Sequence, residues 1–331
     1  MTSSIRICSI AALLASGILL TPVTPDGALR AQAPTAPPAA AAAPSPAASA
    51  AAPASVRALF SQGSMNVYRR FTVDQRPKMV EFYEKALALR PLQPINLGGG
   101  AQMILFGIGT GQIKLATGLK EGRQYTLGEL NAGTGIRVIT LFYPDEAGVT
   151  SRLQAFGYPA PAFKDTGSGT RAALVKDPGG FWIQLIVAPN APAAQYASVE
   201  VGINVSDLAK SRAFYREFVG LDELPAVKDA VLGVTKYPYR HGETTINVWS
   251  VGKGLPADTG SAGIQYVVSN VDAVDANAKT RNVAVETPLS NMAGFSLRTV
   301  WLNDPDGVTN YFAQVGAGGG GGGRRTAPNS Q

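Results

Sequence analysis

Histidine and cysteine are almost absent from this chain. Its 331 residues include one of each, His241 and Cys8. Cys8 lies in an N-terminal apolar segment, so a chain that has lost this segment has no disulfide, cysteine-bound zinc or cysteine nucleophile. A single histidine cannot supply an iron site made of two histidines and a carboxylate. His241 lies in a polar stretch typical of a hairpin loop, and both a surface role and a role as general base are open.

The chain also lacks a concentration of positive charge. It has 29 Lys and Arg residues against 23 Asp and Glu residues, a formal net charge of +6, and the basic residues are scattered. No phosphate-binding P-loop motif and no strand-borne GxGxxG motif is present, and the run Gly98–Gly100 is typical of a turn. The sequence therefore gives no support for a nucleic-acid partner.

The N-terminal segment has the pattern of a secretory signal peptide. Arg6 precedes the largely apolar run Ile7–Leu20, which is shorter than the ~20 residues of a membrane span, and Ala31–Ala33 offers a small-x-small cleavage site. Residues 1–33 are therefore predicted to be a signal peptide, with an uncleaved anchor as the alternative. We expect an exported protein, periplasmic or extracellular, with no stable membrane span after cleavage.

Two further segments have a composition that does not form a packed core. Residues 34–55 are nearly all Ala and Pro, which removes apolar periodicity and prevents a stable helix, so they are predicted to be a linker. Residues 317–331 are predicted to be a Gly-rich disordered tail. Between these segments lie about 260 residues, enough for two cores of ordinary size.

This central part contains an internal repeat. The segment Met79–Tyr83 reads MVEFY and Ser211–Tyr215 reads SRAFY, with the Phe-Tyr pairs 132 residues apart. Further on, Lys176–Trp182 reads KDPGGFW and Asn303–Thr309 reads NDPDGVT, with the Asp-Pro pairs 127 residues apart. A repeat this long predicts two tandem domains rather than a solenoid, and we place them at 64–191 and 197–316.

Each half divides again into two similar units. Asn66–Val73 alternates like a strand and is followed by a helical pattern with Asp74 as a candidate N-cap, and Ser198–Val205 is followed in the same way by Ser206. The second unit of each half begins with a strand, a cap at Asp145 or Asn270, and a helix. Further strands follow the helix in each unit. The pattern therefore predicts a βαβββ unit that occurs four times.

These segments resemble the vicinal-oxygen-chelate superfamily, which includes glyoxalase I, bleomycin- and fosfomycin-resistance proteins, methylmalonyl-CoA epimerase and extradiol dioxygenases. The resemblance is carried by Val201–Leu221 and Trp301–Phe312, and in the first half by Phe71–Leu87 and Val175–Ile186. It implies an α+β fold of tandem glyoxalase-like domains. Each domain would consist of two βαβββ units that form a curved eight-stranded mixed sheet, with the helices outside and a cavity inside.

The resemblance also implies where metal ligands would lie. Relatives that use a metal take His, Gln or Glu ligands from four positions in each domain. Carried over, these positions are Glu200, Asn247, Gly263 and Tyr311 in the second half, and Tyr68, Lys114, Val138 and Gln184 in the first. Because a divalent metal wants several carboxylates or imidazoles, this set predicts that the metal site is lost in both halves, and we predict no metal and no cofactor.

Strand alternation predicts what each cavity carries instead. The second half would present the side chains of Glu200, Asn204, Asn247, Trp249 and Tyr311. Glu200 is the candidate general base if apolar walls surround it, and otherwise a hydrogen-bonded acid at the rim without turnover. Trp249 would stack on a ligand or pack within the sheet.

The first half would present Tyr68, Arg70, Lys114 and Gln184. Two cations side by side favour an anionic ligand, with Arg70 available for a bidentate contact, unless both side chains reach solvent at an open mouth. The hypothesis is thus an exported protein that binds a small anionic molecule at a degenerate metal site. The alternatives are a lyase, isomerase or dioxygenase-like enzyme with Glu200 as base or an unusual metal, and a scaffold with filled cavities. The oligomeric state and the ligand are not predicted.

Overall fold

The structure is a computed structural model that describes residues 54–98, 101–167 and 169–316. By its contacts the chain divides into two compact units, Met1–Ala51 and Ala52–Gln331, and all described residues belong to the second. The predicted signal peptide, nearly all of the predicted linker and the predicted tail lie outside the described residues.

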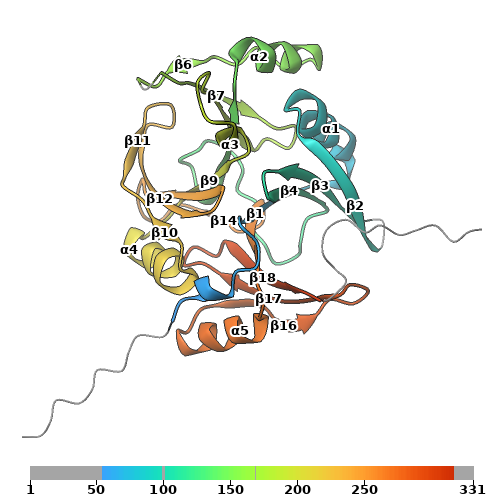
Figure 1. Cartoon of the computed structure of the whole chain (residues 1–331), viewed down its shortest axis with the longest axis vertical. Helices are drawn as coiled ribbons and strands as arrows, with labels where there is room; N and C mark the ends of the chain where they lie inside the picture. The colour runs from blue at the N-terminus through green and yellow to red at the C-terminus, as the bar shows by residue number, and fades with distance from the viewer. Residues whose placement is uncertain (1–53, 99–100, 168, 317–331) are drawn as a thin grey trace, which may run out of the picture. The chain divides into compact units, whose positions relative to one another are not determined.

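The described helices are short and the strands dominate (Figure 1). The helical elements are η1 (Val56–Leu59), η2 (Val73–Gln75), α1 (Arg76–Glu81), η3 (Phe82–Ala86), α2 (Glu146–Ala155), α3 (Ala193–Tyr196), α4 (Leu208–Arg212), η4 (Ala213–Val219) and α5 (Val271–Thr280). The strands of the first two units are β1 (Asn66–Phe71), β2 (Arg90–Gly98), β3 (Ala101–Ile108), β4 (Gly111–Thr117), β5 (Thr134–Tyr143), β6 (Lys164–Asp165), β7 (Arg171–Lys176) and β8 (Trp182–Val187). The later strands are β9 (Val199–Asn204), β10 (Asp222–Glu223), β11 (Val227–Asp229), β12 (Val234–His241), β13 (Thr244–Trp249), β14 (Ala257–Asp258), β15 (Ala262–Val267), β16 (Val285–Asn291), β17 (Leu297–Asn303) and β18 (Thr309–Val315).

The α+β class is confirmed, but the units pair differently from our expectation. One sheet has the order β16-β17-β18-β15-β1-β4-β3-β2 and joins the first unit to the fourth; we call it the end sheet. The other has the order β10-β12-β13-β9-β5-β8-β7-β6, with β11 and β14 paired at its side, and joins the second unit to the third; we call it the middle sheet. The expectation that each contiguous half forms its own sheet is therefore wrong.

The reason lies in the strands that open each unit. β1 pairs antiparallel with β15, and β5 pairs antiparallel with β9. All four opening strands contain apolar residues that recur along the strand, and this periodicity alone does not select a partner. The loop 118–133 between β4 and β5, which we call the crossing loop, carries the chain from the end sheet to the middle sheet. The ranges 64–191 and 197–316 remain predictions of where the two tandem domains begin and end in the sequence.

The helix caps agree with the sequence prediction in two of the four units. Asp145 and Asn270 cap α2 and α5 by accepting a hydrogen bond from a backbone N–H three residues further on. The cap of α4 is Asp207, one residue after the predicted Ser206. The cap predicted at Asp74 is not formed, because Asp74 lies inside the 3-10 turn η2, which leads directly into α1.

The repeated motifs contact one another. In the first half the Tyr83 hydroxyl donates to Asp177 Oδ2 over 3.2 Å, and in the second half Tyr215 donates to Asp304 Oδ2 over 2.7 Å. Each helix that carries a Phe-Tyr pair is thus tied to the Asp-Pro turn that begins the last strand of the same half. Arg69 forms a buried ion pair with Asp177 at 3.1 Å. Asp304 has no such cation among the described residues, and burial raises the pKa of its carboxyl to about 7.

The helices and the sheets bury one large apolar cluster. Met79, Phe82 and Tyr83 from the first helical segment pack in it, as do Phe214 and Tyr215 from the second. Helix α5 packs against β16, β17 and β18 (Figure 1). Because side chains alternate along a strand, each sheet turns its other face away from this cluster. These other faces carry the predicted site residues.

Candidate functional site

Polar and aromatic residues gather on one face of the end sheet, which we call the end-sheet polar face. Tyr68 and Lys114 are neighbours in the parallel register of β1 and β4, and Arg70 follows Tyr68 on the same side. Gln265 on β15 pairs with Tyr311 on β18. Tyr68, Arg70, Lys114, Gln265 and Tyr311 thereby come from four adjacent strands of one sheet.

The corresponding face of the middle sheet, the middle-sheet polar face, carries four polar residues. Thr140 on β5 pairs with Gln184 on one side and with Glu200 on the other. Asn247 on β13 donates from Nδ2 to Glu200 Oε2 over 2.6 Å. Thr140 Oγ1 donates to Gln184 Oε1 over 2.9 Å.

Two predicted residues therefore change places. Gln184 was expected beside Lys114, and it lies instead beside Glu200 on the middle sheet. Tyr311 was expected beside Glu200, and it lies instead beside Tyr68 on the end sheet, with the two ring centroids 6.0 Å apart. Both corrections follow from the interleaved pairing of the units.

Lys114 is buried on the end-sheet polar face, with 9% of its surface exposed, and does not reach solvent at an open mouth. Its Nζ donates to Gln265 Oε1, which also accepts from Asn66 Nδ2 over 3.0 Å. Lys114 has no carboxylate partner among the described residues. Burial consequently lowers the pKa of its ammonium to about 8.

Three further cations surround the mouth of this face, and two of them come from the crossing loop. Lys120 Nζ lies 2.5 Å from Glu286 Oε1, and Arg123 Nη1 lies 3.5 Å from Glu286 Oε2. Arg70 lies over the Tyr68 ring at 5.8 Å and forms no ion pair with a described carboxylate. These residues line a narrow crevice, which we call the pocket of this face.

Two aromatic side chains, Tyr68 and Trp301, line that pocket. Trp301 stacks on Tyr311 with ring centroids 4.9 Å apart, and Lys120 Nζ lies 4.6 Å from the centre of the Trp301 ring. Burial raises the pKa of both Tyr68 and Tyr311, so both phenols stay neutral. A Cβ atom at position 263 would lie 2.3 Å from the Tyr68 ring, so Gly263 is what allows the phenol to occupy this place.

The middle-sheet polar face is closed by a lysine that the sequence reasoning missed. Lys236 on β12 places its Nζ 3.3 Å from Glu200 Oε2 and 3.2 Å from Asp229 Oδ2. Burial opposes its charge, but the two carboxylates outweigh this effect and the pKa of the ammonium is raised. Asp229 also accepts from Gln184 Nε2 over 3.1 Å. Glu200 thus lies beside an ammonium and an amide, on the face that also carries the apolar cluster of Val138, Trp182 and Trp249.

Asn204 and Trp249 do not join this polar cluster. Asn204 is fully buried and donates to Gly133 O over 2.8 Å. The Trp249 indole N–H points to Asn131 Oδ1 at 3.3 Å, and its ring fills the space above Gly202, where a Cβ atom would lie 2.6 Å away. Both residues hold the end of the crossing loop against the middle sheet.

The donor sets of the two faces do not fit a divalent metal ion. The described residues contain no group of three His, Cys, Asp or Glu side chains that could hold one. Where carboxylates do meet, at Glu200 and Asp229, the Lys236 ammonium lies between them. His241 lies apart from both faces, at the end of β12, with Nε2 2.7 Å from Gln62 O and its ring 4.4 Å from that of Phe60.

The residues that were missed carry weak sequence signals. Lys120 and Arg123 belong to the crossing loop, which has no periodicity that would assign them to a face. Asp229 and Lys236 lie on either side of the tight connection between β11 and β12. The alternation of β12 places Lys236 two residues before Pro238, which pairs with Asn247, and this was the one usable signal.

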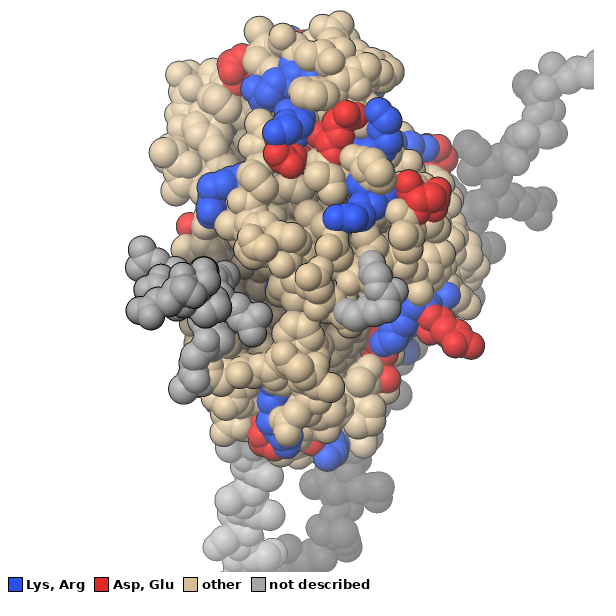
Figure 2. Space-filling model, turned by 90° about the vertical axis from the view of Figure 1, so that its right-hand side faces the viewer, with Lys and Arg blue, Asp and Glu red and all other residues tan. Residues whose placement is uncertain are grey.

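No described helix is long and apolar enough to cross a membrane. On the surface seen in Figure 2, Lys and Arg side chains are interspersed with Asp and Glu, and the described residues there form no continuous basic stripe. This view agrees with the scattered charges of the sequence.

Comparisons with known proteins agree with this architecture. Residues 67–185 and 197–312 match the family described as Glyoxalase/Bleomycin resistance protein/Dioxygenase superfamily. Glyoxalase I from Zea mays is similar in structure, with 18% identity, a TM-score of 0.56 and coverage of 76% of this chain and 92% of that one. A putative dioxygenase from Bacillus subtilis has 14% identity, a TM-score of 0.55 and coverage of 78% and 87%. At these identities the likeness shows the fold alone. No curated protein sequence matches the chain significantly.

Proposed function

The chain belongs to the Glyoxalase/Bleomycin resistance protein/Dioxygenase superfamily, and from this premise we propose that it binds a small anion, without a metal ion, at the end-sheet polar face. The observation that carries the proposal is the charge around the pocket. Arg70, Lys120 and Arg123 face a single carboxylate, that of Glu286. Among the described residues, two positive charges are thus left without a counter-charge in a partly desolvated place, and an anion would supply it.

The size of the pocket limits the ligand. As its side chains stand, the pocket is a crevice without open volume the size of a water molecule, so only a compact anion that displaces them, such as phosphate or a small carboxylate, would enter. Arg70 offers the planar fork that pairs with two oxygens of such a group. The neutral Tyr68 phenol beside it is a hydrogen-bond donor, and Trp301 closes one side.

The test compares anions with neutral analogues. We expect calorimetric titration to show binding of phosphate or acetate and no binding of acetamide. Arg70→Ala removes one charge-assisted contact, worth roughly 1.5–3 kcal/mol, so affinity should fall about tenfold or more. Arg76→Ala, on the exposed surface of α1, is the matched control and should leave affinity unchanged.

Equal affinity of the Arg70→Ala variant, or equal binding of acetamide, would contradict the proposal. Metal analysis of the same preparation tests the metal-free part separately. Stoichiometric divalent metal that disappears on Glu200→Ala would overturn that part and would favour the enzymatic alternative. The contacts of Glu200 with Lys236 and Asn247 give that alternative less support, because the carboxylate that would act as base is already paired with an ammonium and an amide of the protein.

We also propose that the protein is exported, on the signal-peptide pattern of residues 1–33. Mass spectrometry of protein from cell fractions should show an exported form that lacks this segment. A full-length chain confined to the cytoplasm would refute export and would leave the anion site untouched.

A further inference from the structure

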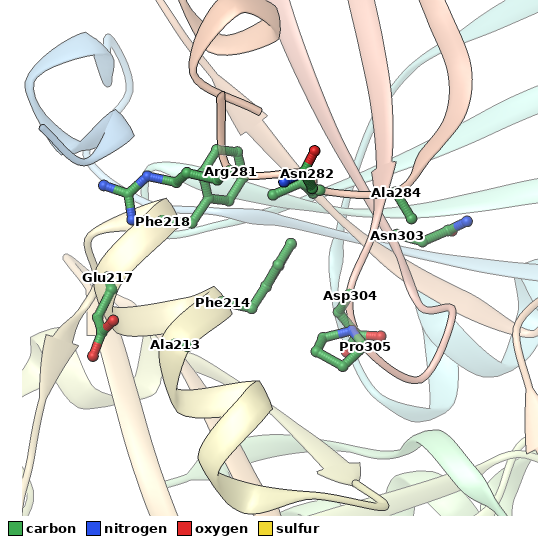
Figure 3. A pocket seen from close by; sticks show the side chains of 11 residues that line it. Ala213, Phe214, Glu217, Phe218, Arg281, Asn282, Ala284, Asn303, Asp304 and Pro305 are labelled. Carbon is green, nitrogen blue, oxygen red and sulfur yellow. The ribbon is translucent and has the colours of Figure 1, made fainter. Parts of the chain in front are cut away.

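A separate cleft of about 330 Å³ lies on the helical side of the second half. Its apolar lining includes Phe214 and Phe218 from η4, Val283 after α5, and Pro305 after β17. Figure 3 shows the Phe214 ring in the cleft, with Asp304 and Pro305 across from it. The cleft shares no residue with the pocket on the end-sheet polar face.

The internal repeat shows what the same place holds in the first half. After α2 and after α5 the chain turns in the same way. Gly157 and Asn282 both have positive φ, +81° and +53°, and each donates to the carbonyl oxygen three residues earlier. Tyr158 and Val283 follow them, and each donates to the carbonyl oxygen five residues earlier, over 3.0 and 2.9 Å. Tyr158 and Val283 are therefore equivalent positions.

Their partners are equivalent as well. Phe82 and Phe214 are the phenylalanines of the two Phe-Tyr repeats. In the first half the Tyr158 ring packs edge-on against Phe82, with centroids 4.9 Å apart and an angle of 70°. This is the favoured arrangement of an aromatic pair. In the second half Val283 has no ring to offer Phe214, and the cleft lies there.

From this difference we infer that the cleft binds a small uncharged aromatic molecule, whose ring packs against Phe214 as the Tyr158 ring packs against Phe82. The volume of the cleft accommodates a ring of phenol size. Two acidic residues, Glu217 and Asp304, and one basic residue, Arg281, lie in its lining. The Asp304 carboxyl already accepts the Tyr215 hydroxyl, so the cleft carries no strong charge of either sign. The ligand class thus differs from that of the end-sheet polar face.

The experiment uses p-cresol, the side chain of tyrosine as a free molecule, and the whole mature chain. Calorimetric or NMR titration of the wild type should show one site. Val283→Tyr places the missing ring in the cleft and should weaken binding by at least about tenfold. Tyr158→Val is the reciprocal variant, and because it opens the equivalent place in the first half, p-cresol should then bind at two sites.

A crystal soaked with p-bromophenol gives a readout that does not depend on a variant folding. Anomalous density for bromine beside Phe214 supports the inference. Density at another place only, no binding of p-cresol by the wild type, or unchanged affinity in a folded Val283→Tyr variant each overturn it.

Discussion

The two polar faces each bury a lysine, and the pKa values of the two ammonium groups are shifted in opposite directions. Lys236 on the middle sheet lies between the carboxylates of Glu200 and Asp229, and its pKa is raised. Lys114 on the end sheet has only the amide oxygen of Gln265, and its pKa is lowered to about 8. Both side chains are buried to nearly the same degree, so the difference comes from their partners.

The contrast shows that the charges of the middle-sheet polar face are compensated within the protein, whereas those of the end-sheet polar face are not. Thr140, Gln184, Asp229, Lys236 and Glu200 form a continuous chain of polar contacts on the middle sheet. Such a network leaves little for a ligand to gain, because its charges already compensate one another. Among the described residues the end-sheet polar face keeps uncompensated positive charge, and for this reason we propose the anion site there.

The largest expected effect is on stability, and it tests the middle sheet. Lys236→Met would leave Glu200 and Asp229 close together without their shared cation. Breaking a buried pair in this way costs about 3–5 kcal/mol, and we expect the free energy of unfolding in urea to fall by an amount near the lower end. The double variant Lys236→Met with Glu200→Gln should recover part of the loss. An unchanged unfolding midpoint for Lys236→Met would show that the network contributes nothing.

The next effect is a pH dependence on the end sheet. The folded protein loses the Lys114 proton near pH 8, whereas the unfolded chain keeps it until about pH 10.5. Between these values the unfolded state binds more protons, so stability due to Lys114 rises with pH, by at most about 1.4 kcal/mol per pH unit. Lys114→Met lacks this contribution and provides the reference, because other titrating groups cancel in the difference. A constant difference between the two proteins from pH 7 to 10.5 would refute the buried, unpaired ammonium.

The smallest expected effect is a thermal shift on phosphate binding, which tests which of the two polar faces holds the anion. Phosphate that binds only the folded state should raise the thermal midpoint by a few degrees when its concentration exceeds the dissociation constant. The shift should survive in Glu200→Gln, which alters the middle sheet, and should disappear in Arg70→Ala, which alters the end sheet. The reverse pattern would move the anion site to the middle sheet.

The sequence predicted those features that depend on local pattern. The Phe-Tyr helices and Asp-Pro turns, the caps at Asp145 and Asn270, and the shared face of Arg70 and Lys114 follow from short-range periodicity and turn chemistry. The position of Tyr311 beside Tyr68 did not, because it depends on which unit pairs with which. The apolar residues of the four opening strands do not identify their partners, so that choice depends on long-range packing.

The partners of the buried lysines were unpredictable for a related reason. The β11–β12 connection that brings Asp229 to Lys236 has no long periodic segment, and the crossing loop that brings Lys120 to Glu286 has none at all. The partners of charged residues on such segments are determined only when the fold places these segments over a sheet. Strand alternation predicted which face of the sheet each side chain occupies, but only the structure shows its contacts there.

The pairing of β1 with β15 has a consequence for how the protein is made. Val67 pairs with Ile264, so the first strand of the fold waits for a partner that is synthesised almost at the end of the chain. The middle sheet, whose units are adjacent in sequence, can close much earlier, since short loops cost less entropy to form. During synthesis β1 to β4 thus remain a half-sheet with an open edge. Such an edge is the place where a chaperone, or a second unfinished chain, would attach.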